Sequence, residues 1–322
     1  MKRFGVFLFL ALASLLVEAQ GNYPNKPVRV IVPFAPGGAS DFVARIMQPR
    51  LGELLGQGIV VENKPGAAGS VGVDAAAKSA PDGYTVFLGN VGSIAINPSV
   101  LPNLQVNPLR DLVAVTQVVD VPSVLVVHPS LPVNSIKELV AYAKANPGKL
   151  NYASPGSGSL DRLEMEVLRR LERLDMVHVP YKGGAGPAVA GLMGGETHMM
   201  FATAASAMPG VKSGRLKILA VTSAKRLEQV PSAPTVSELS YPDLAASSWQ
   251  GFFVPAGTPK EVVERLHAVA VQVMATPEVV TRLSTGGAVP LTSANPAAFA
   301  EYVAGETRRW ARIAKESNAT PD

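Results

Sequence analysis

The chain of 322 residues contains no cysteine, which excludes disulfide bonds, thiolate zinc sites and a cysteine nucleophile. Aromatic residues make up only 6% of it and no run of five basic residues occurs, so we expect no nucleic-acid surface. Charged residues are also scarce, at 17%, whereas hydrophobic residues reach 47%. This balance is typical of a compact globular protein, and the length leaves room for two lobes.

Signatures of enzymes and metal sites are equally sparse. The four histidines do not pair at metal-ligand spacing, and neither HExxH nor a phosphate-loop pattern occurs. Glu164 and Glu166 are two residues apart on a predicted helix, so they face different ways and do not form a paired acid/base site. The stretch AGSVG (68–72) loosely resembles a nucleophile elbow, but KPGA (64–67) separates it from the preceding strand. We therefore predict no catalytic residue, no metal and no cofactor.

One long apolar run stands at the N-terminus, from Phe4 to Val17, between a basic start and the small-residue site Val17-Glu18-Ala19. This pattern predicts a secretory signal peptide over residues 1–19. The run is shorter than the roughly 20 residues that span a bilayer, and no cysteine follows it to carry a lipid. We expect an exported protein that is soluble after cleavage.

Short β-branched runs alternate with longer helical patterns along the rest of the chain, which predicts an α/β fold with largely parallel sheet. Two such units suggest two lobes. Residues 111–128 are long enough to cross from one lobe to the other, and we expect 216–222 to cross back. The predicted boundaries are residues 20–122 and 223–322 for lobe 1 and 123–222 for lobe 2, with a mainly helical C-terminal segment.

The stretch PFAPGGASD (33–41) is the strongest site candidate, because it follows the apolar run VRVIV (28–32) and opens an amphipathic helix. A strand that ends in a glycine pair and turns into a helix presents backbone N–H groups at the positive end of the helix dipole. Gly37 and Gly38 allow a ligand to approach the backbone closely. The pattern predicts an anion site, in which Asp41 caps the first turn or favours the dipole.

Four more stretches of small, hydrogen-bonding residues follow predicted strands: GNVGS (89–93), SPGSGS (154–159), YKGGAG (181–186) and ATAAS (202–206). Ligands of open α/β sheets bind beyond the carboxyl ends of the strands, so loops from both lobes can meet at one cleft. Lys182 and Arg162 are the cationic residues nearest these loops. Trp249 and Phe252 are expected in the core or the cleft wall.

With these stretches in view, the sequence resembles the Bug family of periplasmic solute-binding proteins, which are associated with tripartite tricarboxylate transporters. The resemblance runs from about Tyr23 to the C-terminal helix. It is carried by motifs in family order: YPNKPVRVIVPFAPGGASDFVAR, VVENKPGAAGSVG, PDGYT, AINP, YASPGSGS, MVHVPYKGGAG and LAVTS.

The resemblance implies a two-lobed periplasmic binding protein of type II that closes on a small carboxylate held by backbone amides, hydroxyls and water. Arg162 is added as a cation for a second acidic group on the ligand. The ligand-binding residues implied by the family pattern, together with Arg162, are Phe34, Gly38, Ala39, Asp41, Ser93, Ser157, Ser159, Arg162, Thr203 and Ser206. Family members usually carry a histidine at the position of Arg162, an aspartate at that of His198, and a histidine or other polar residue at that of Ile94.

The expected function is capture of a small organic acid or acidic amino acid in the periplasm, by a monomer that delivers it to transporter components in the membrane. Closure by hinge bending would couple binding to recognition by the partner. Two alternatives stay open. An exported serine hydrolase would need a histidine in contact with Ser70, Ser93, Ser157 or Ser159. A signalling receptor would bind the same ligand and dock on a sensor protein.

Overall fold

The computed structural model describes residues 23–101, 103–181 and 183–316. The predicted signal peptide (1–19) and Lys182 lie outside these ranges. Ten strands form one continuous, mixed sheet in the order β2-β1-β3-β9-β4-β7-β5-β6, with β8 and β10 paired to β4. The strands are β1 (Val28–Val32), β2 (Ile59–Asn63), β3 (Thr85–Asn90), β4 (Leu112–Val127), β5 (Leu150–Ser154), β6 (Met176–Pro180), β7 (Met199–Thr203), β8 (Lys217–Val221), β9 (Ser247–Pro255) and β10 (Val289–Pro290).

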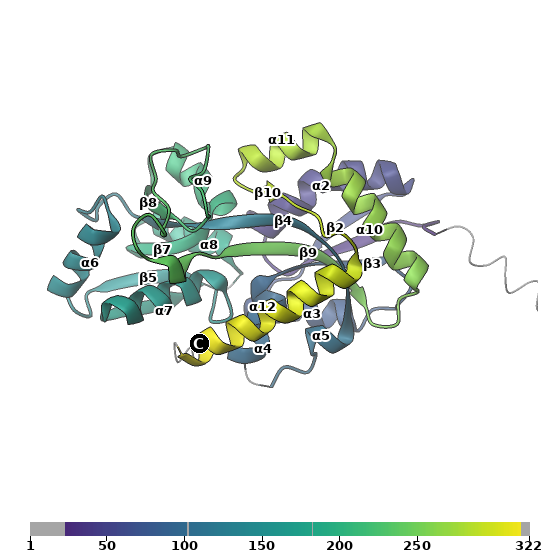
Figure 1. The fold of residues 1–322 in the computed structure, drawn as a ribbon, viewed down its shortest axis with the longest axis horizontal. Helices are drawn as coiled ribbons and strands as arrows, with labels where there is room; N and C mark the ends of the chain where they lie inside the picture. The colour runs from purple at the N-terminus through teal and green to yellow at the C-terminus, as the bar shows by residue number, and fades with distance from the viewer. Residues whose placement is uncertain (1–22, 102, 182, 317–322) are drawn as a thin grey trace, which may run out of the picture.

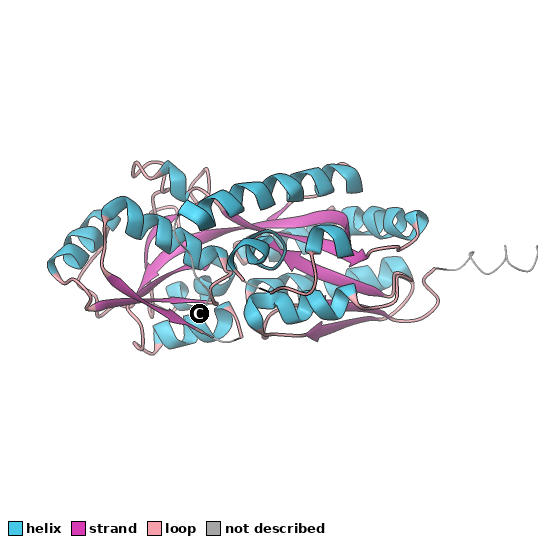
Figure 2. Cartoon of the chain, turned by 90° about the horizontal axis from the view of Figure 1, so that it is seen from below, coloured by secondary structure: helices cyan, strands magenta, loops and turns pink. Residues whose placement is uncertain are grey.

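Helices cover both sides of the strands, as Figure 2 shows. In the first part of the chain they are α2 (Ala39–Leu55), η2 (Ala67–Gly69), α3 (Ser70–Ala77), the π-helix η3 (Gly92–Ile96), α4 (Asn97–Val100) and α5 (Pro108–Asp111). In the rest they are α6 (Ile136–Ala145), α7 (Leu160–Glu172), α8 (Ala185–Met193), α9 (Ala204–Lys212), η4 (Pro242–Leu244), α10 (Lys260–Met274), α11 (Pro277–Thr285) and α12 (Pro296–Glu316). None of the described helices is both long enough and apolar enough to cross a bilayer.

Lobe 1 is built on the parallel strands β2, β1 and β3, which lie on the right in Figure 1. The strand VRVIV is almost wholly buried, as expected for a parallel strand covered on both faces. Helix α2 packs its apolar side chains, among them Val43, Met47 and Leu51, into the same core. It ends at Gly56, whose φ of 68° is the left-handed conformation that glycine adopts at little cost.

Lobe 2, on the left in Figure 1, repeats this plan with the parallel strands β6, β5 and β7. Tyr152 and Phe201 are fully buried in its core. Strand β8 adds to the lobe by pairing antiparallel with the second part of β4, from Val124 to Val127. The two α/β units predicted from the sequence are therefore confirmed.

Two long strands join the lobes. The 16 residues of β4 pair with β9 up to Pro122 and with β7 and β8 from Ser123 onward, so this strand makes the expected first crossing. The prediction that 216–222 crosses back is wrong. Those residues form β8, which is only five residues long and stays in lobe 2, and the return is made by the nine residues of β9, some 30 positions later. Both Trp249 and Phe252 on β9 are buried, as predicted.

The segment between β8 and β9 packs with lobe 2. Val236 and Leu244 are buried in the core of Tyr152, while Leu227 and Ala233 join the neighbouring cluster around Met200. These contacts place residues 223–246 beside lobe 2, although the sequence suggested that lobe 1 resumes at residue 223.

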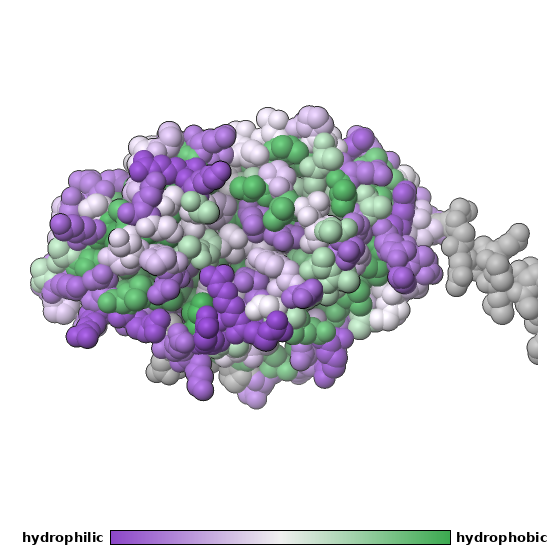
Figure 3. Space-filling model, in the orientation of Figure 1, coloured by the Kyte–Doolittle hydropathy of each residue, from purple (hydrophilic) through white to green (hydrophobic). Residues whose placement is uncertain are grey.

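Helix α12 lies along the crossing strands and contacts β4 (Figure 1). Its buried face contributes Phe299, Val303 and Trp310 to a cluster that also contains Leu160 of lobe 2. Glu306 accepts hydrogen bonds from the indole N–H groups of Trp249 and Trp310, at 3.1 and 3.0 Å. Hydrophilic residues gather over the outer side of this helix in Figure 3, so α12 is an amphipathic cover of the connection between the lobes.

Candidate ligand-binding site

A cavity lies where the strands of both lobes end. Lobe 1 contributes residues from the loops after β1 and β3, together with Ser248 of β9; lobe 2 contributes residues from the ends of β5 and β7 and from the start of α8. Its volume is about 40 Å³, which holds roughly three ordered waters at about 10–15 Å³ each. Carboxyl ends of strands are the usual place for a ligand in an α/β fold.

Four α-helices begin at this cavity. Its lining includes Ala39 at the start of α2, Leu160 at the start of α7, Ala185 at the start of α8 and Thr203, the N-cap of α9. The first N–H groups of a helix have no partner within it, and the helix dipole places partial positive charge there. No basic side chain occurs among the described residues of the lining. The helix starts therefore offer an anion backbone N–H donors and no basic side chain.

The start of α2 leaves its amide donors available. The N-cap is Gly38, which has no side chain to accept a hydrogen bond from the first turn. Asp41 instead accepts hydrogen bonds from the backbone N–H of Gly37 at 3.2 Å, from Arg45 at 2.9 Å and from Asn63 at 3.0 Å. Burial alone would raise the pKa of Asp41, but these hydrogen bonds outweigh it and lower the pKa below its usual value. Asp41 thus fixes the turn and does not line the cavity.

Five of the predicted site residues line the cavity: Phe34, Gly38, Ala39, Ser159 and Thr203. The others lie around them. Thr203 donates from its hydroxyl to Ser206 at 2.8 Å, and Ser93 accepts from the backbone N–H of Asn90, a lining residue, at 3.1 Å. Ser157 is buried beside the lining residues Pro155 and Ser159 without being one of them.

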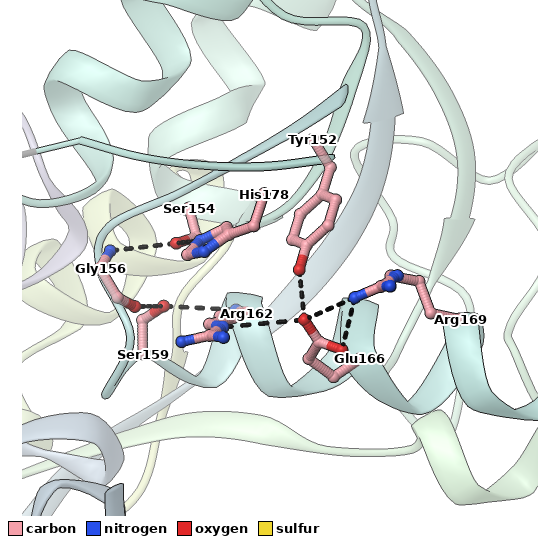
Figure 4. Close-up of polar contacts among 8 residues, drawn as sticks. All are labelled: Tyr152, Ser154, Gly156, Ser159, Arg162, Glu166, Arg169 and His178. Atoms are coloured by element: carbon pink, nitrogen blue, oxygen red, sulfur yellow. Dashed lines mark hydrogen bonds and ion pairs between the residues drawn. The ribbon is translucent and has the colours of Figure 1, made fainter. Parts of the chain in front are cut away.

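Arg162 lies behind the cavity wall. Its guanidinium is buried, and Nε lies 3.8 Å from Oε1 of Glu166 (Figure 4). Glu166 also accepts from Arg169 at 2.9 Å and from the hydroxyl of Tyr152. Arg162 is not among the lining residues, and its charge lies beside a carboxylate of its own helix. That it meets a second acidic group of the ligand stays a prediction.

Serine and histidine side chains are in contact between Ser130 and His128, at an exposed turn, and between Ser154 and His178. Neither serine is one of the four that a hydrolase was expected to use. The Oγ of Ser154 lies 2.6 Å from Nε2 of His178 and accepts from the backbone N–H of Gly156 (Figure 4). Ser154 is fully buried and does not line the cavity, so a substrate would not reach it. His198 bonds to Asn151 at 2.7 Å, away from the site. Geometry does not favour the hydrolase alternative.

Sequence reasoning missed Asp161, the one acidic residue among the described residues of the lining. It is the second residue of α7, two positions after the end of the predicted SPGSGS loop, and that position was the available signal. Burial raises the pKa of Asp161 to about 7. Burial, together with the nearby charge of Asp161, also raises the pKa of Glu164, one turn further along the helix, well above its usual value.

A second, outer groove adjoins the cavity and shares Phe34 and Pro155 with it. The lobes touch here. The backbone N–H of Ala35 in lobe 1 donates to the carbonyl of Gly183 in lobe 2 at 2.9 Å. A Cβ on Gly184 would come within 2.9 Å of the Phe34 ring, so this approach requires glycine. The cavity is closed on this side by contacts between the lobes.

A cavity suited to anions, enclosed by two α/β lobes that share crossing strands, defines a two-lobed solute-binding protein. A model of the tripartite tricarboxylate transporter family receptor, TctC, matches residues 43–319. Protein BugT of Bordetella pertussis is 36% identical over 314 residues, which cover 97% of this chain and 96% of BugT.

Solved structures agree. The structure of the periplasmic binding protein BugD is 34% identical with a TM-score of 0.88, covering 93% of this chain and 100% of that one. MatC from Rhodopseudomonas palustris, solved with bound malate, is 31% identical with a TM-score of 0.86, covering 90% of this chain and 99% of that one. This chain belongs to the tripartite tricarboxylate transporter receptor family, and the Bug proteins are its relatives. It has the periplasmic binding protein fold. The resemblance and fold class expected from the sequence are confirmed.

Proposed function

We propose that this receptor captures a small organic carboxylate between its two lobes in the periplasm and delivers it to the membrane components of a tripartite tricarboxylate transporter. The observation that carries the proposal is the cavity at which four helices begin without a basic side chain in its described lining. Backbone donors at such positions bind carboxylates readily. The malate bound to the related MatC supports the same class of ligand.

Neutral donors suit a protein that must release what it binds. A buried ion pair between ligand and receptor would be costly to separate, because each charge would remain unpaired in a dry site. Amide and hydroxyl donors give directional hydrogen bonds without this penalty. Asp41 and Arg162, which lie near the site without lining it, are already engaged within the protein.

The proposed lobes are residues 23–122 with 247–316, and residues 123–246. The first boundary falls within β4, where pairing passes from β9 to β7. The second falls at the start of β9, because the segment before it packs with lobe 2. Closure then requires bending of two strands and of the α12 cover, while the loop contact between Ala35 and Gly183 forms or breaks.

A thermal-shift panel of small carboxylates tests the ligand class. A true ligand at about 100 times its dissociation constant stabilises the folded protein by roughly 2.7 kcal/mol, which raises the melting temperature by several degrees. Chloride and sulfate at matched ionic strength serve as controls. If no carboxylate in the panel shifts the melting temperature beyond these salts, the proposed function is wrong.

The partner is tested separately. The carboxylate-loaded receptor is expected to co-purify with detergent-solubilised transporter components and not with a sensor kinase. Retention by a sensor protein alone would assign the chain to signalling.

A further inference from the structure

Asp161 is a buried carboxylate that the fold leaves without a partner. It lines the cavity and is only 4% exposed. Within the described ranges, its carboxylate makes no hydrogen bond and no ion pair, and burial is the one cause of its pKa shift. Buried charges are normally paired, because an isolated one loses its hydration without compensation. The described part of the protein therefore supplies no partner for the Asp161 carboxylate.

The next acid along the helix is also buried. Glu164 lies one turn further along α7, is 2% exposed, and neither of its carboxylate oxygens has a hydrogen-bond partner. The Ser123 hydroxyl is close enough to lower the pKa of Glu164 but makes no hydrogen bond of ordinary geometry with it. This side of the site therefore carries two buried acids, and the described residues of the cavity lining include no basic side chain.

The opposite side has the reverse character. The start of α2 presents backbone N–H donors to the cavity. The acid of that turn, Asp41, already accepts hydrogen bonds from Arg45, Asn63 and Gly37. A ligand that is only an anion satisfies the α2 side but brings a second negative charge toward Asp161. A ligand with adjacent positive and negative groups satisfies both sides.

We propose that the ligand carries an ammonium group close to its carboxylate, and that Asp161 binds the ammonium while the helix starts bind the carboxylate. The proposal rests on the proposed function and narrows it to amino acids and related amino carboxylates. Asp161 is the residue that selects for the ammonium. A site built to bind a cationic donor rejects the analogue that lacks it, because the buried acceptor is then left unpaired.

Matched ligand pairs test this inference by calorimetry: aspartate against succinate and malate, glutamate against glutarate, and alanine against propionate. Members of each pair share the carbon chain and differ at the carbon that bears the amine. We expect the amino member of at least one pair to bind at least 50-fold more tightly than its analogues. Equal or tighter binding of the analogues would overturn the inference and leave the proposed function standing, whereas absence of binding by every carboxylate would overturn both.

The variant Asp161→Asn keeps the size of the side chain and removes its charge. We expect it to lose at least 50-fold in affinity for the amino ligand and to bind the deamino analogue as well as, or better than, the unmodified protein. Asp243→Asn, which removes an exposed carboxylate from the same lobe, is the matched control and should change neither affinity. If Asp161→Asn unfolds, the pair comparison on the unmodified protein still decides the question.

Proton release supplies a readout that a merely structural Asp161 would not move. The groups close to it are Glu164 on the same helix and, next to Glu164, Ser123 on β4 and Arg309 on α12. At pH 6, calorimetry in buffers of different ionisation enthalpy should show release of up to one proton per amino ligand, because the ammonium favours ionised Asp161. Asp161→Asn should abolish the release. Proton uptake by the unmodified protein would mean that Asp161 donates to an anion, and would overturn the inference.

Discussion

The starts of α2 and α7 face the same cavity from opposite lobes, and they differ in how each handles the acid of its first turn. In α2 the N-cap is glycine and Asp41 is held by Arg45 and Asn63, so its charge is neutralised and the amides remain available. In α7 the N-cap Ser159 accepts from the N–H of Arg162 at 3.2 Å, and Asp161 stays unpaired. Two similar strand-to-helix turns thus present opposite electrical character to one ligand.

The largest expected effect concerns stability and pH in the ligand-free protein. The pKa of Asp161 is about 7 when folded and near 3.8 when unfolded, a difference of about three units or roughly 4 kcal/mol. Below pH 4 the carboxyl is protonated in both states and costs nothing. Between pH 4 and 7 the unfolded state ionises first, so the free energy of unfolding falls, and above pH 7 the loss is complete. Glu164 acts in the same direction.

Urea denaturation at pH 5, 6, 7 and 8 measures this fall. Asp161→Asn should make the fall less steep, leaving the part that comes from Glu164, so that the variant gains stability relative to the unmodified protein as the pH rises. Parallel curves for the two proteins would contradict the burial of an unpaired acid at α7.

The acid of α2 should behave in the opposite way. Asp41→Ala removes the acceptor of hydrogen bonds from three groups, two of them side chains, and should lower the free energy of unfolding at pH 7 by about 2–3 kcal/mol. Because the folded pKa of Asp41 is lowered, its stabilisation is present above the unfolded pKa and is lost as the pH falls through the folded pKa. A stability gain in Asp41→Ala at neutral pH would remove the contrast between the two turns.

A third variant tests whether the two turns must approach each other. A Cβ on Gly158, in the loop before α7, would lie 1.7 Å from Oδ1 of Asn97 in lobe 1. Asn97 is held in place by hydrogen bonds to the carbonyl of Ala68 and the hydroxyl of Ser70, both at 3.0 Å. We expect Gly158→Ala to oppose closure and weaken ligand binding by about 10- to 100-fold, the equivalent of about 1–3 kcal/mol of overpacking. Gly58→Ala, where no atom lies within 4 Å of the new Cβ, is the control.

The smallest effect is expected at Arg162. Its charge faces Glu166, which keeps Arg169 and Tyr152 as partners when Arg162 is replaced. Arg162→Met should therefore leave the calorimetric affinity for carboxylates unchanged. A large loss of affinity would show that this cation acts on the ligand, as the sequence suggested.

Much of this comparison was predictable from the sequence. The apolar run before PFAPGGASD and the helical spacing after it predicted the donor side at α2, because strand, glycine turn and helix are local features. The recurrence of small polar loops predicted that Ser159 and Thr203 would share one site with Gly38.

The features that the sequence did not predict depend on contacts between residues far apart in the chain. Asp161 is an ordinary polar residue of a first turn in sequence, and only packing of the second lobe removes it from water. The i,i+4 spacing on α7 allows Arg162 to lie beside Glu166. Whether that face of the helix packs against Tyr152 or turns toward the cavity depends on the folding of lobe 2 and not on the local sequence. The return crossing was misplaced because the apolar stretch 216–222 resembles any buried strand, and its short length does not reveal that it pairs with β4 inside lobe 2.

The central claim is that main-chain amides at the helix starts hold the carboxylate, and Ala39→Pro tests it most directly. Proline removes the N–H of the first residue of α2 and puts a ring carbon in its place, at a position where helices accept proline. The extended Gly38 before it (φ −85°, ψ 170°) is compatible with this. Lys260→Pro makes the same change at the exposed start of α10. Calorimetry with the best carboxylate of the panel should show at least tenfold weaker binding for Ala39→Pro and unchanged binding for Lys260→Pro. Equal affinities in both folded variants would contradict the claim.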